Sequence, residues 1–324
     1  MIQKKCFEKN NQFGKYSIVK SNLVVGSNDK IVPEVSIIMP IYNHPDYFEK
    51  ALKSAIDQDY MGLYDIIVVD NNHPIYQAKN QEIVENCKSE KVKYYLNESN
   101  IGGAGNANRG VELSSATYVT FCHDDDLLEP DCLSSLIEAK NKISGDCLIV
   151  GHHVRIDKDG NILNKHSYKK SKELKKISLW NYLLGNNSNG GGSLYNRSTF
   201  IEIGGYIEEY IPCPDYYLNS AYTYLKKTYY LHKTTLRYRI SDQSDSKLCY
   251  IDIPIAHDKV YRDIVNSGRV NRIIAGYVHY FSNKAMVYYN KNIWSNKKNI
   301  RDMLAGMLYN FVNRFNALII KYIK

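Results

Sequence analysis

Apolar and polar residues alternate in blocks along the first half of the chain, and the blocks differ in their period. An apolar run of strand length stops at Pro40. Residues 44–60 then place apolar side chains three and four positions apart, as in a helix, and Asn43 ahead of Pro45 is the predicted cap. Further strands, with helices between them, are predicted at 64–72, 91–97 and 117–126. This alternation predicts an α/β fold with a mostly parallel sheet that is covered on both faces.

The second half of the chain is less regular and becomes helical toward its end. A helix is predicted at 129–143, and two strands joined by a turn at 147–163, with a polar linker after them. Residues 187–206 are rich in small residues and predict a loop that borders a ligand before it passes into a strand and a helix. Another helix is predicted at 214–227, and helical spacing dominates from Asp252 onward.

Polar residues follow each predicted strand of the first half. In parallel sheets, ligands bind beyond the carboxyl ends of the strands, so we expect these side chains to gather on one rim. They are Pro40, Tyr42 and Asn43, then Asp70, Asn71 and Asn72, then Asn97 and Asn100, and finally His123, Asp124, Asp125 and Asp126.

The three consecutive aspartates are the sharpest of these signals. Adjacent carboxylates repel, and they stay ionised together only when they are exposed or neutralised by a cation. Hard oxygen ligands at a strand end suit Mg²⁺ or Mn²⁺, which binds one or two carboxylates together with substrate phosphate oxygens. The alternative is a solvated acidic loop that caps the next helix. The apolar strand in front of the run favours the metal site.

The stretch NESNIGGAGNANRG is the second candidate. It lacks the third glycine of the dinucleotide-binding pattern, because Asn108 stands in that place, and NAD binding is therefore disfavoured. Small residues at a helix start still let a ligand approach the backbone, and an arginine there neutralises phosphate. A plain turn with a surface arginine is the alternative. The candidates for nucleotide-sugar contact are Asn100, Gly103, Asn106 and Arg109.

Two single acids complete the set of candidates. Asp70 ends the second predicted strand, where an acid commonly receives a ribose hydroxyl or a base N–H, although it also suits a cap. Asp215 opens a predicted helix beyond the glycine-rich loop. It is either the N-cap of that helix or a carboxylate base.

The composition indicates where the protein is located and which kind of partner it binds. The seven cysteines are scattered and never in CxxC spacing, which indicates reduced thiols in a cytoplasm, and no stretch predicts a signal peptide or a spanning helix. Of the net charge of +8, residues 291–324 hold seven basic side chains against Asp302 alone, which is +6. A basic end on a nearly neutral body disfavours nucleic acid and favours acidic lipid headgroups. The apolar stripe in this tail indicates either internal packing or an interfacial membrane helix.

Taken together, the segments over about residues 35–246 resemble the family 2 glycosyltransferases of GT-A fold. In order, the similar segments are VSIIMPIYNHPDYFEKALKSAIDQDY, YDIIVVDN, NIGGAGNANRG, FCHDDDLLEP, GGSLYNRSTFIEIGGY, PDYYLNSAY and RYRISDQSDS. The resemblance implies inverting transfer of a sugar from a nucleotide donor, usually a UDP-sugar, to an acceptor hydroxyl. It divides the chain into an extension at 1–34, a catalytic domain at 35–246 and a helical region at 247–324. It also suggests a lipid-linked acceptor in bacterial surface polysaccharide synthesis, such as capsule or O-antigen, at the inner face of the cytoplasmic membrane.

The resemblance assigns roles to individual residues. The base and ribose contacts are Pro40, Tyr42, Asn43 and Asp70; the diphosphate and metal contacts are Asp124, Asp125 and Asp126; the acceptor-activating base is Asp215; and Arg239 and Ser244 lie in a loop that closes near the diphosphate. Two positions depart from the family pattern. His123 stands where the first acid of the metal motif is usual, and Asn71 replaces an acid after the second strand.

Two other functions are weighed against this prediction. A sugar nucleotidyltransferase needs a basic, glycine-rich triphosphate loop after its first strand, where this chain has PIYNHPDY. A catalytically silent scaffold of the same fold is suggested by the missing acid at His123.

Overall fold

A computed structural model describes residue 7 and residues 11–27, 32–184, 190–240 and 252–293, together with residues 311–312, 315–316 and 318. The predicted residue Ser244 and most of the basic tail lie outside these residues.

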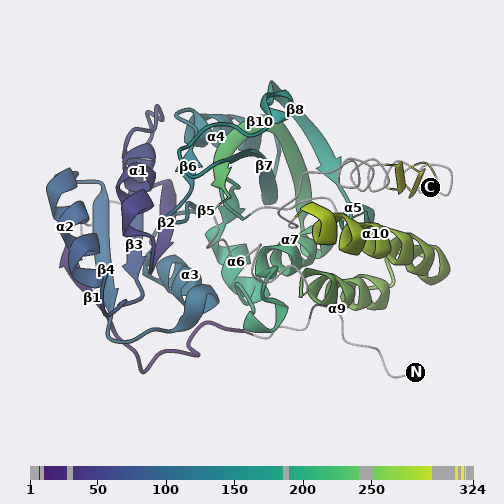
Figure 1. The fold of residues 1–324 in the computed structure, drawn as a ribbon, viewed down its shortest axis with the longest axis horizontal. Helices are drawn as coiled ribbons and strands as arrows, with labels where there is room; N and C mark the ends of the chain where they lie inside the picture. Colours follow the sequence, from purple (N-terminus) through teal and green to yellow (C-terminus); the bar gives the residue numbers. More distant parts are fainter. Residues whose placement is uncertain are drawn as a thin grey trace.

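The larger sheet has the strand order β1-β4-β3-β2-β5-β9 (Figure 1). Its four central strands are parallel, while an antiparallel strand lies at each edge. The strands are β1 (Ser21–Val25), β2 (Val35–Ile41), β3 (Tyr64–Asp70), β4 (Val92–Asn97), β5 (Tyr118–Phe121) and β9 (Tyr195–Asn196). The predicted α/β fold with a mostly parallel sheet is thus confirmed.

The strand β2 continues one residue beyond Pro40, where the sequence predicted its end. Proline has no N–H to donate, and inside a sheet it is tolerated where no ladder bond is lost. Here β5 pairs with β2 only as far as Ile38, so nothing on that side requires the missing N–H of Pro40.

Helices cover both faces of this sheet, and each face has its own apolar core. Ile37 and Met39 point to one face and Ile38 to the other, as the two-residue period of a strand requires. The first face is covered by α1 (Pro45–Ile56), α2 (Gln77–Cys87) and α4 (Cys132–Asn141). The second face is covered by α3 (Gly102–Leu113), α6 (Arg197–Ile203) and α7 (Pro214–Leu225). The helix α1 begins after His44 rather than after Asn43, and no side chain caps it.

A smaller sheet is built around the long strand β10 (Lys227–Arg239). It pairs in parallel with β7 (Cys147–Ile156) and antiparallel with β6 (Leu127–Leu128) and β8 (Lys170–Ile177). The strand β8 falls where a polar linker was predicted, and that prediction is wrong. The second strand predicted within 147–163 is reduced to a single bridge between Ile162 and Ile156.

The helical end of the described chain packs against the second face. This end consists of α9 (Ile253–Asn266) and α10 (Arg272–Ile293), and α5 (Leu179–Leu183), from the middle of the chain, packs with α10 (Figure 1). Two short turns, at Lys165–Ser167 and Glu208–Tyr210, complete the helical elements named here. One apolar core runs from Phe121 through Tyr217 to Val260 and Val278. Among the described helices, none has the length and apolar content needed to span a bilayer.

The N-terminal extension is part of this fold. Residues 11–25, called the N-terminal strap below, first contact Arg109 and Glu112 of α3 and then form β1 at the sheet edge. Gln12 donates its main-chain N–H to the oxygen of Gly204 at 3.1 Å, and Lys15 pairs with Glu208 at 2.6 Å. The strap therefore joins the edge of the larger sheet to the segment that precedes α7.

Candidate active site

Four asparagines tie the strand ends together below the rim. Asn106 donates to main-chain oxygens at the ends of β2 and β3, at 3.3 and 2.8 Å, and accepts from Asn97 at 2.9 Å. Asn71 donates to Asn100 at 2.8 Å. Amides suit this place because they donate and accept at once, and strand ends leave main-chain groups without ladder partners. Asn100 and Asn106 were predicted to contact a nucleotide, and the structure uses their amides within this network.

Asp70 is turned inward. Its side chain is fully buried and accepts hydrogen bonds from Asn72, Asn80 and Tyr94 at 2.8–2.9 Å. Burial raises the pKa of Asp70, and these donors oppose the shift. In this structure Asn72, Asn80 and Tyr94 thus occupy the Asp70 carboxylate, and its contact with a ribose or base stays a prediction.

Arg109 lies two turns down α3 and holds the N-terminal strap. Its guanidinium donates to the main-chain oxygens of Val19 and Tyr16 at 2.8 Å, and it pairs with Glu112 at 2.9 Å. The side chain is buried in these contacts. These acceptors occupy the guanidinium in the structure, and its contact with phosphate stays a prediction.

The remaining rim candidates are more open. Asn43 is exposed beside the start of α1. Gly103 is exposed at the start of α3, and a side chain there would meet no described atom within 4 Å. Pro40 and Tyr42 are partly exposed, and the main-chain N–H of Tyr42 donates to Asp124 at 3.0 Å.

The aspartate run follows β5 directly, and its three carboxylates have different surroundings. Asp124 is buried against the N–H of Tyr42; burial raises its pKa to about 7, and the nearby charge of Asp125 adds to the effect. Asp126 is buried and accepts from the main-chain N–H of Arg239 at 2.9 Å; burial and Asp125 raise its pKa. Asp125 is partly exposed, and no hydrogen bond or ion pair joins its carboxylate to another described residue.

His123, at the place of the usual first acid, is exposed, and its Nδ1 lies 4.0 Å from Asp126. Within the described residues, no three His, Cys, Asp or Glu side chains converge to hold a metal ion by themselves.

Arg239 holds the aspartate run in place through hydrogen bonds. It ends β10, is 1% exposed, and donates to main-chain oxygens of Asp125, Asp157 and Lys158 at 2.7–2.9 Å. Its guanidinium also lies over the ring of Tyr47, 4.4 Å from the ring centre. A buried guanidinium needs such acceptors around it. Arg239 therefore lies at a buried strand end beside the aspartate run, and its contact with a diphosphate stays a prediction.

The glycine-rich loop connects Asp215 to the same strand end. Gly191 bridges to Phe121 of β5, and Gly192 donates its N–H to the oxygen of Phe121 at 2.9 Å. Gly190 donates its N–H to the carboxylate of Asp215. A side chain at Gly190 would lie 2.3 Å from the hydroxyl of Tyr206, so any other residue would displace the Tyr206 ring. The loop thus borders Asp215, while its predicted contact with a ligand stays a prediction.

Asp215 is the second residue of α7 and remains partly exposed. Besides Gly190, the N–H of Tyr216 donates to it at 2.9 Å. Burial raises the pKa of Asp215 to about 6, although the N–H donors oppose the shift. A carboxylate with this pKa is ionised at neutral pH and still basic enough to accept a proton.

Sequence reasoning missed an aromatic group at the ends of β2 and β3. His73 packs edge-on against Tyr42, with ring centres 4.7 Å apart, and stacks on Tyr76 at 4.5 Å. A signal was available, because His73 and Tyr76 follow the second predicted strand and so lie at the rim. The three rings are partly exposed, and Tyr42 lies next to the exposed Asn43 in the chain.

Comparisons with known proteins agree with this arrangement. A family model described as Glycosyl transferase family 2 matches residues 36–204. The GalNAc(5)-diNAcBac-PP-undecaprenol beta-1,3-glucosyltransferase of Campylobacter jejuni is 32% identical over 228 residues, which cover 67% of this chain and 68% of that protein. Glycosyltransferase GlyA of Streptococcus pneumoniae is 26% identical over 239 residues, which cover 66% of this chain and 32% of that protein.

Solved structures of S. aureus TarS share the fold. The complex with UDP has a TM-score of 0.57 at 18% identity, and covers 83% of this chain and 77% of that one. The complex with UDP-GlcNAc has a TM-score of 0.60 at 16% identity, and covers 85% of this chain and 80% of that one. With the family model and the Campylobacter relative, these findings give the conclusion that the chain belongs to glycosyl transferase family 2 and has the GT-A fold.

Proposed function

We propose that this protein moves a sugar from a UDP-sugar to a hydroxyl of a lipid-linked saccharide, with inversion at the anomeric carbon, in the synthesis of a bacterial surface polysaccharide. One observation carries the proposal. The strand β5 leads directly into the aspartate run, and the loop that holds Asp215 pairs with the last residue of the same strand. Acids suited to the donor and a base suited to the acceptor are therefore anchored to one strand end.

The donor half of the site is the rim above β2 and β3. The aromatic group of Tyr42, His73 and Tyr76 gives a nucleobase a surface to pack on, with Asn43 and Pro40 beside it. The choice of UDP is supported by the fold shared with TarS, which binds UDP and UDP-GlcNAc.

The aspartate run fits Mg²⁺ or Mn²⁺. Asp124 and Asp126 are buried with raised pKa values, and a cation nearby would stabilise their charged forms. Asp125 is the carboxylate left open, so we assign it the direct contact, with the remaining ligands from diphosphate oxygens and water. When bound, the cation neutralises charge that develops on the departing diphosphate.

Asp215 supplies the base. In the proposed step, an acceptor oxygen attacks the anomeric carbon while the bond from that carbon to the UDP oxygen breaks. Asp215 takes the proton of the attacking hydroxyl, and UDP leaves with the bonding electron pair. A single displacement with one base inverts the configuration and needs no covalent intermediate.

The lipid-linked acceptor is supported by the Campylobacter relative, whose name includes a PP-undecaprenol carrier. This chain also has a surface suited to a membrane. The helix α10 exposes Ile273, Tyr277, Tyr280 and Phe281 along one side, while Ala275 and Val278 are buried on the other. We therefore propose that the protein acts at the surface of the membrane that carries its acceptor, from the cytoplasmic side.

The experiment is a measurement of UDP release with Mn²⁺ over a panel of UDP-sugars, with and without polyprenyl-diphosphate-linked saccharides. Replacing Asp215 by Asn should lower transfer by about 10²- to 10⁴-fold, the usual effect of losing a general base, and leave UDP binding intact. Replacing Asp125 by Asn should weaken UDP binding in the presence of Mn²⁺. The exposed acid Asp57, replaced in the same way, serves as the control and should change neither quantity.

Other outcomes would support the rival functions. UDP binding without turnover of any donor would favour a silent scaffold. Release of diphosphate from a nucleoside triphosphate and a sugar phosphate would favour a nucleotidyltransferase.

A further inference from the structure

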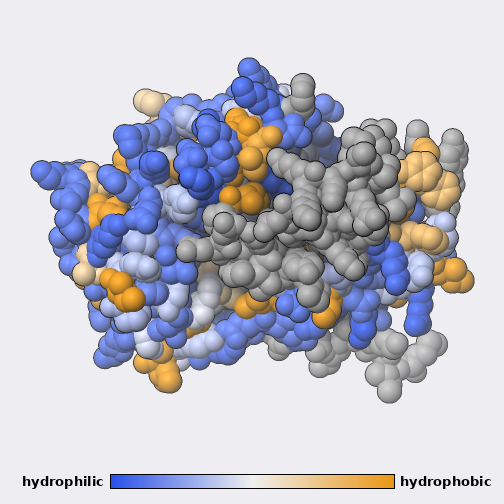
Figure 2. All heavy atoms as spheres, in the orientation of Figure 1, coloured by the Kyte–Doolittle hydropathy of each residue, from blue (hydrophilic) through white to orange (hydrophobic). Residues whose placement is uncertain are grey.

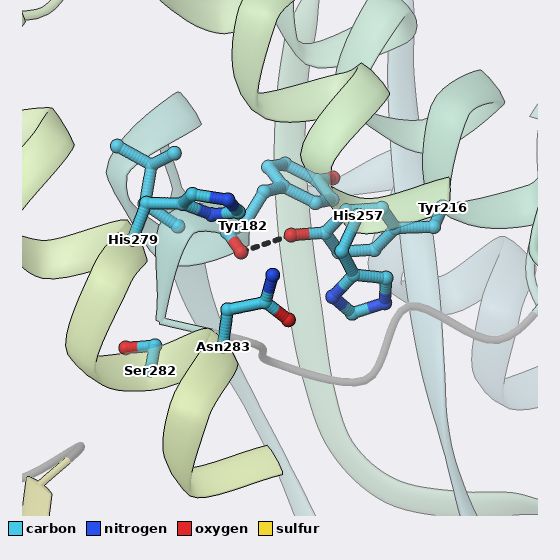
Figure 3. Close-up of a pocket in the computed structure, with 7 residues that line it drawn as sticks. Tyr182, Tyr216, His257, His279, Ser282 and Asn283 are labelled. Carbon is cyan, nitrogen blue, oxygen red and sulfur yellow. Dashed lines mark hydrogen bonds between the residues drawn. The ribbon is translucent and has the colours of Figure 1, made fainter. Parts of the chain in front are cut away.

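The C-terminal helices contact the residue that follows the proposed base. The ring of Tyr216 lies flat against the imidazole of His257 in α9, with ring centres 4.0 Å apart and planes 2° from parallel. The hydroxyl of Tyr216 donates to the main-chain oxygen of Tyr182 in α5 (Figure 3). Tyr216 is thus held at its ring face and at its hydroxyl.

Tyr216 also touches the base itself. Its main-chain N–H donates to the carboxylate of Asp215 at 2.9 Å, so one peptide unit joins the carboxylate to the stacked ring. The space around the stack is small. A cavity of about 10 Å³, room for one water molecule, is lined by Tyr182, Tyr216, His257 and Asn283 among others (Figure 3). The Tyr216 ring has little freedom to move unless His257 is removed.

We propose that His257 is a positioning residue, through which the helix α9 fixes the direction of the Asp215 carboxylate toward the acceptor hydroxyl. The inference rests on the proposed function of Asp215. It gives the C-terminal helices a part in catalysis as well as in membrane contact. The family model ends at residue 204, so both α7 and α9 lie outside the region that it matches.

His257 acts here through its flat face and not through a charge. Burial lowers the pKa of His257 to about 3, and the neighbouring His279 adds to the effect, so the ring is neutral at working pH. No described residue provides a hydrogen-bond partner for its ring nitrogens. A phenylalanine ring at this position should therefore serve nearly as well.

The same helix pair offers a matched control. Tyr261 of α9 stacks on His279 of α10, with ring centres 4.1 Å apart and planes 6° from parallel. This stack has the same composition and geometry as the first one, but it joins α9 to α10 and leaves α7 untouched. Replacing Tyr261 by Ala removes an equivalent contact without touching Tyr216.

The test compares full-length His257→Ala, His257→Phe and Tyr261→Ala in the transfer assay, with kcat, both KM values, UDP binding and thermal midpoint measured for each. We expect His257→Ala to lower kcat by about ten- to a hundredfold, the scale of a small misplacement of a reacting group, with the donor KM and UDP binding unchanged. His257→Phe should restore most of kcat. Tyr261→Ala should lower the thermal midpoint and keep kcat.

Unchanged kcat in His257→Ala, an equal loss in Tyr261→Ala, or no rescue by His257→Phe would each overturn the inference. If His257→Ala does not fold, His257→Gln, which keeps polarity and length but has no ring, must show the same loss of kcat. Asp215→Asn separates this inference from the proposal beneath it. If Asp215→Asn is inactive while His257→Ala is fully active, only the positioning role fails. If Asp215→Asn retains transfer, the assignment of the base fails, and the positioning role with it.

Discussion

The burial of Asp215 raises the pKa of its carboxyl group, which suits the proposed base but lowers the stability of the fold at neutral pH. The group has a pKa of about 6 in the folded protein, whereas an aspartate in an unfolded chain titrates near 4. Because the folded pKa is the higher one, the contribution of Asp215 to stability is fully present below about pH 4 and is lost as the pH rises through 6. At neutral pH the folded protein therefore bears the free-energy cost of a buried, ionised carboxylate.

Asp215→Asn should consequently raise the free energy of unfolding at pH 7.5, by about 1–2 kcal/mol after allowance for partial exposure and for imperfect hydrogen bonding of the amide. The gain should shrink at pH 5, where most of the wild-type carboxyl group is protonated. Urea denaturation of both proteins at the two pH values measures this. The exposed Asp57→Asn should show no such pH-dependent difference, and equal gains at both pH values for Asp215→Asn would contradict the burial argument.

At the level of single residues, the sequence could indicate the type of site but not the direction of each side chain. The aspartate run was predicted because adjacent acids follow an apolar strand, and Asp215 because it follows the glycine-rich loop at a helix start. Asp70 satisfied the same rule, yet it is fully buried against Asn80 and Tyr94. Which way a side chain turns at a strand end depends on tertiary neighbours that a local pattern does not contain.

The secondary-structure elements differ in how well the sequence predicts them. Strands β2 to β5 and the helices between them were predicted because each buries apolar residues with a clear period. The strand β8 was missed because its sequence, KSKELKKI, is half lysine and mostly exposed, with Leu174 and Ile177 alone packed against the core. Its strand conformation comes from pairing with β10, a contact between distant parts of the chain.

The N-terminal strap is a second element that no local pattern predicts. Arg109 was expected at the ligand because it follows a glycine-rich helix start. The helix α3 begins at Gly102, however, and seven residues at 1.5 Å each carry Arg109 about 10 Å down the axis. There it meets the strap, whose main-chain oxygens it satisfies.

Arg109→Met should therefore destabilise the protein and spare the donor site. The substitution leaves the oxygens of Tyr16 and Val19 without their donor, and each such loss costs about 1–3 kcal/mol, so we expect a total of about 2–4 kcal/mol. Urea denaturation measures the stability and calorimetry the UDP affinity. Arg155→Met, at an exposed arginine, is the control. Normal stability with weakened UDP binding would instead support the phosphate contact predicted for Arg109.

For the molecule as a whole, the place of the basic and exposed apolar side chains says more about a binding surface than the net charge does. Residues 264–324 hold ten lysines and arginines against Asp302 alone, a charge of +9, which leaves the other 263 residues at −1. The exposed side of α10 lies in this basic region. Next to it, Asn316 donates to Ser282 at 3.0 Å, and Phe311, Phe315 and Leu318 are exposed. Figure 2 shows hydrophobic side chains gathered at this end of the molecule, on the right.

Exposed aromatic side chains within a basic region are typical of a surface that binds anionic lipid headgroups. A lipid-linked acceptor keeps its saccharide at such a headgroup layer. Contact through α10 would place the enzyme where the acceptor is, and the stack of His257 on Tyr216 would link that region to Asp215. The position of α10 at one end of the molecule, with α1 and α2 at the other (Figure 1), makes the idea testable with matched charge changes.

The protein should bind vesicles that contain phosphatidylglycerol, and the double variant Arg272→Gln, Lys284→Gln should bind them about 30-fold more weakly. The estimate follows from about 1 kcal/mol for each basic residue near an anionic surface. The double variant Lys50→Gln, Lys53→Gln on α1 removes the same charge from the opposite end and should bind nearly as well as wild type. Cosedimentation over a range of vesicle concentrations gives both affinities. Equal weakening by the two double variants would mean that only net charge matters, and unchanged binding by the α10 variant would exclude that helix as the membrane contact.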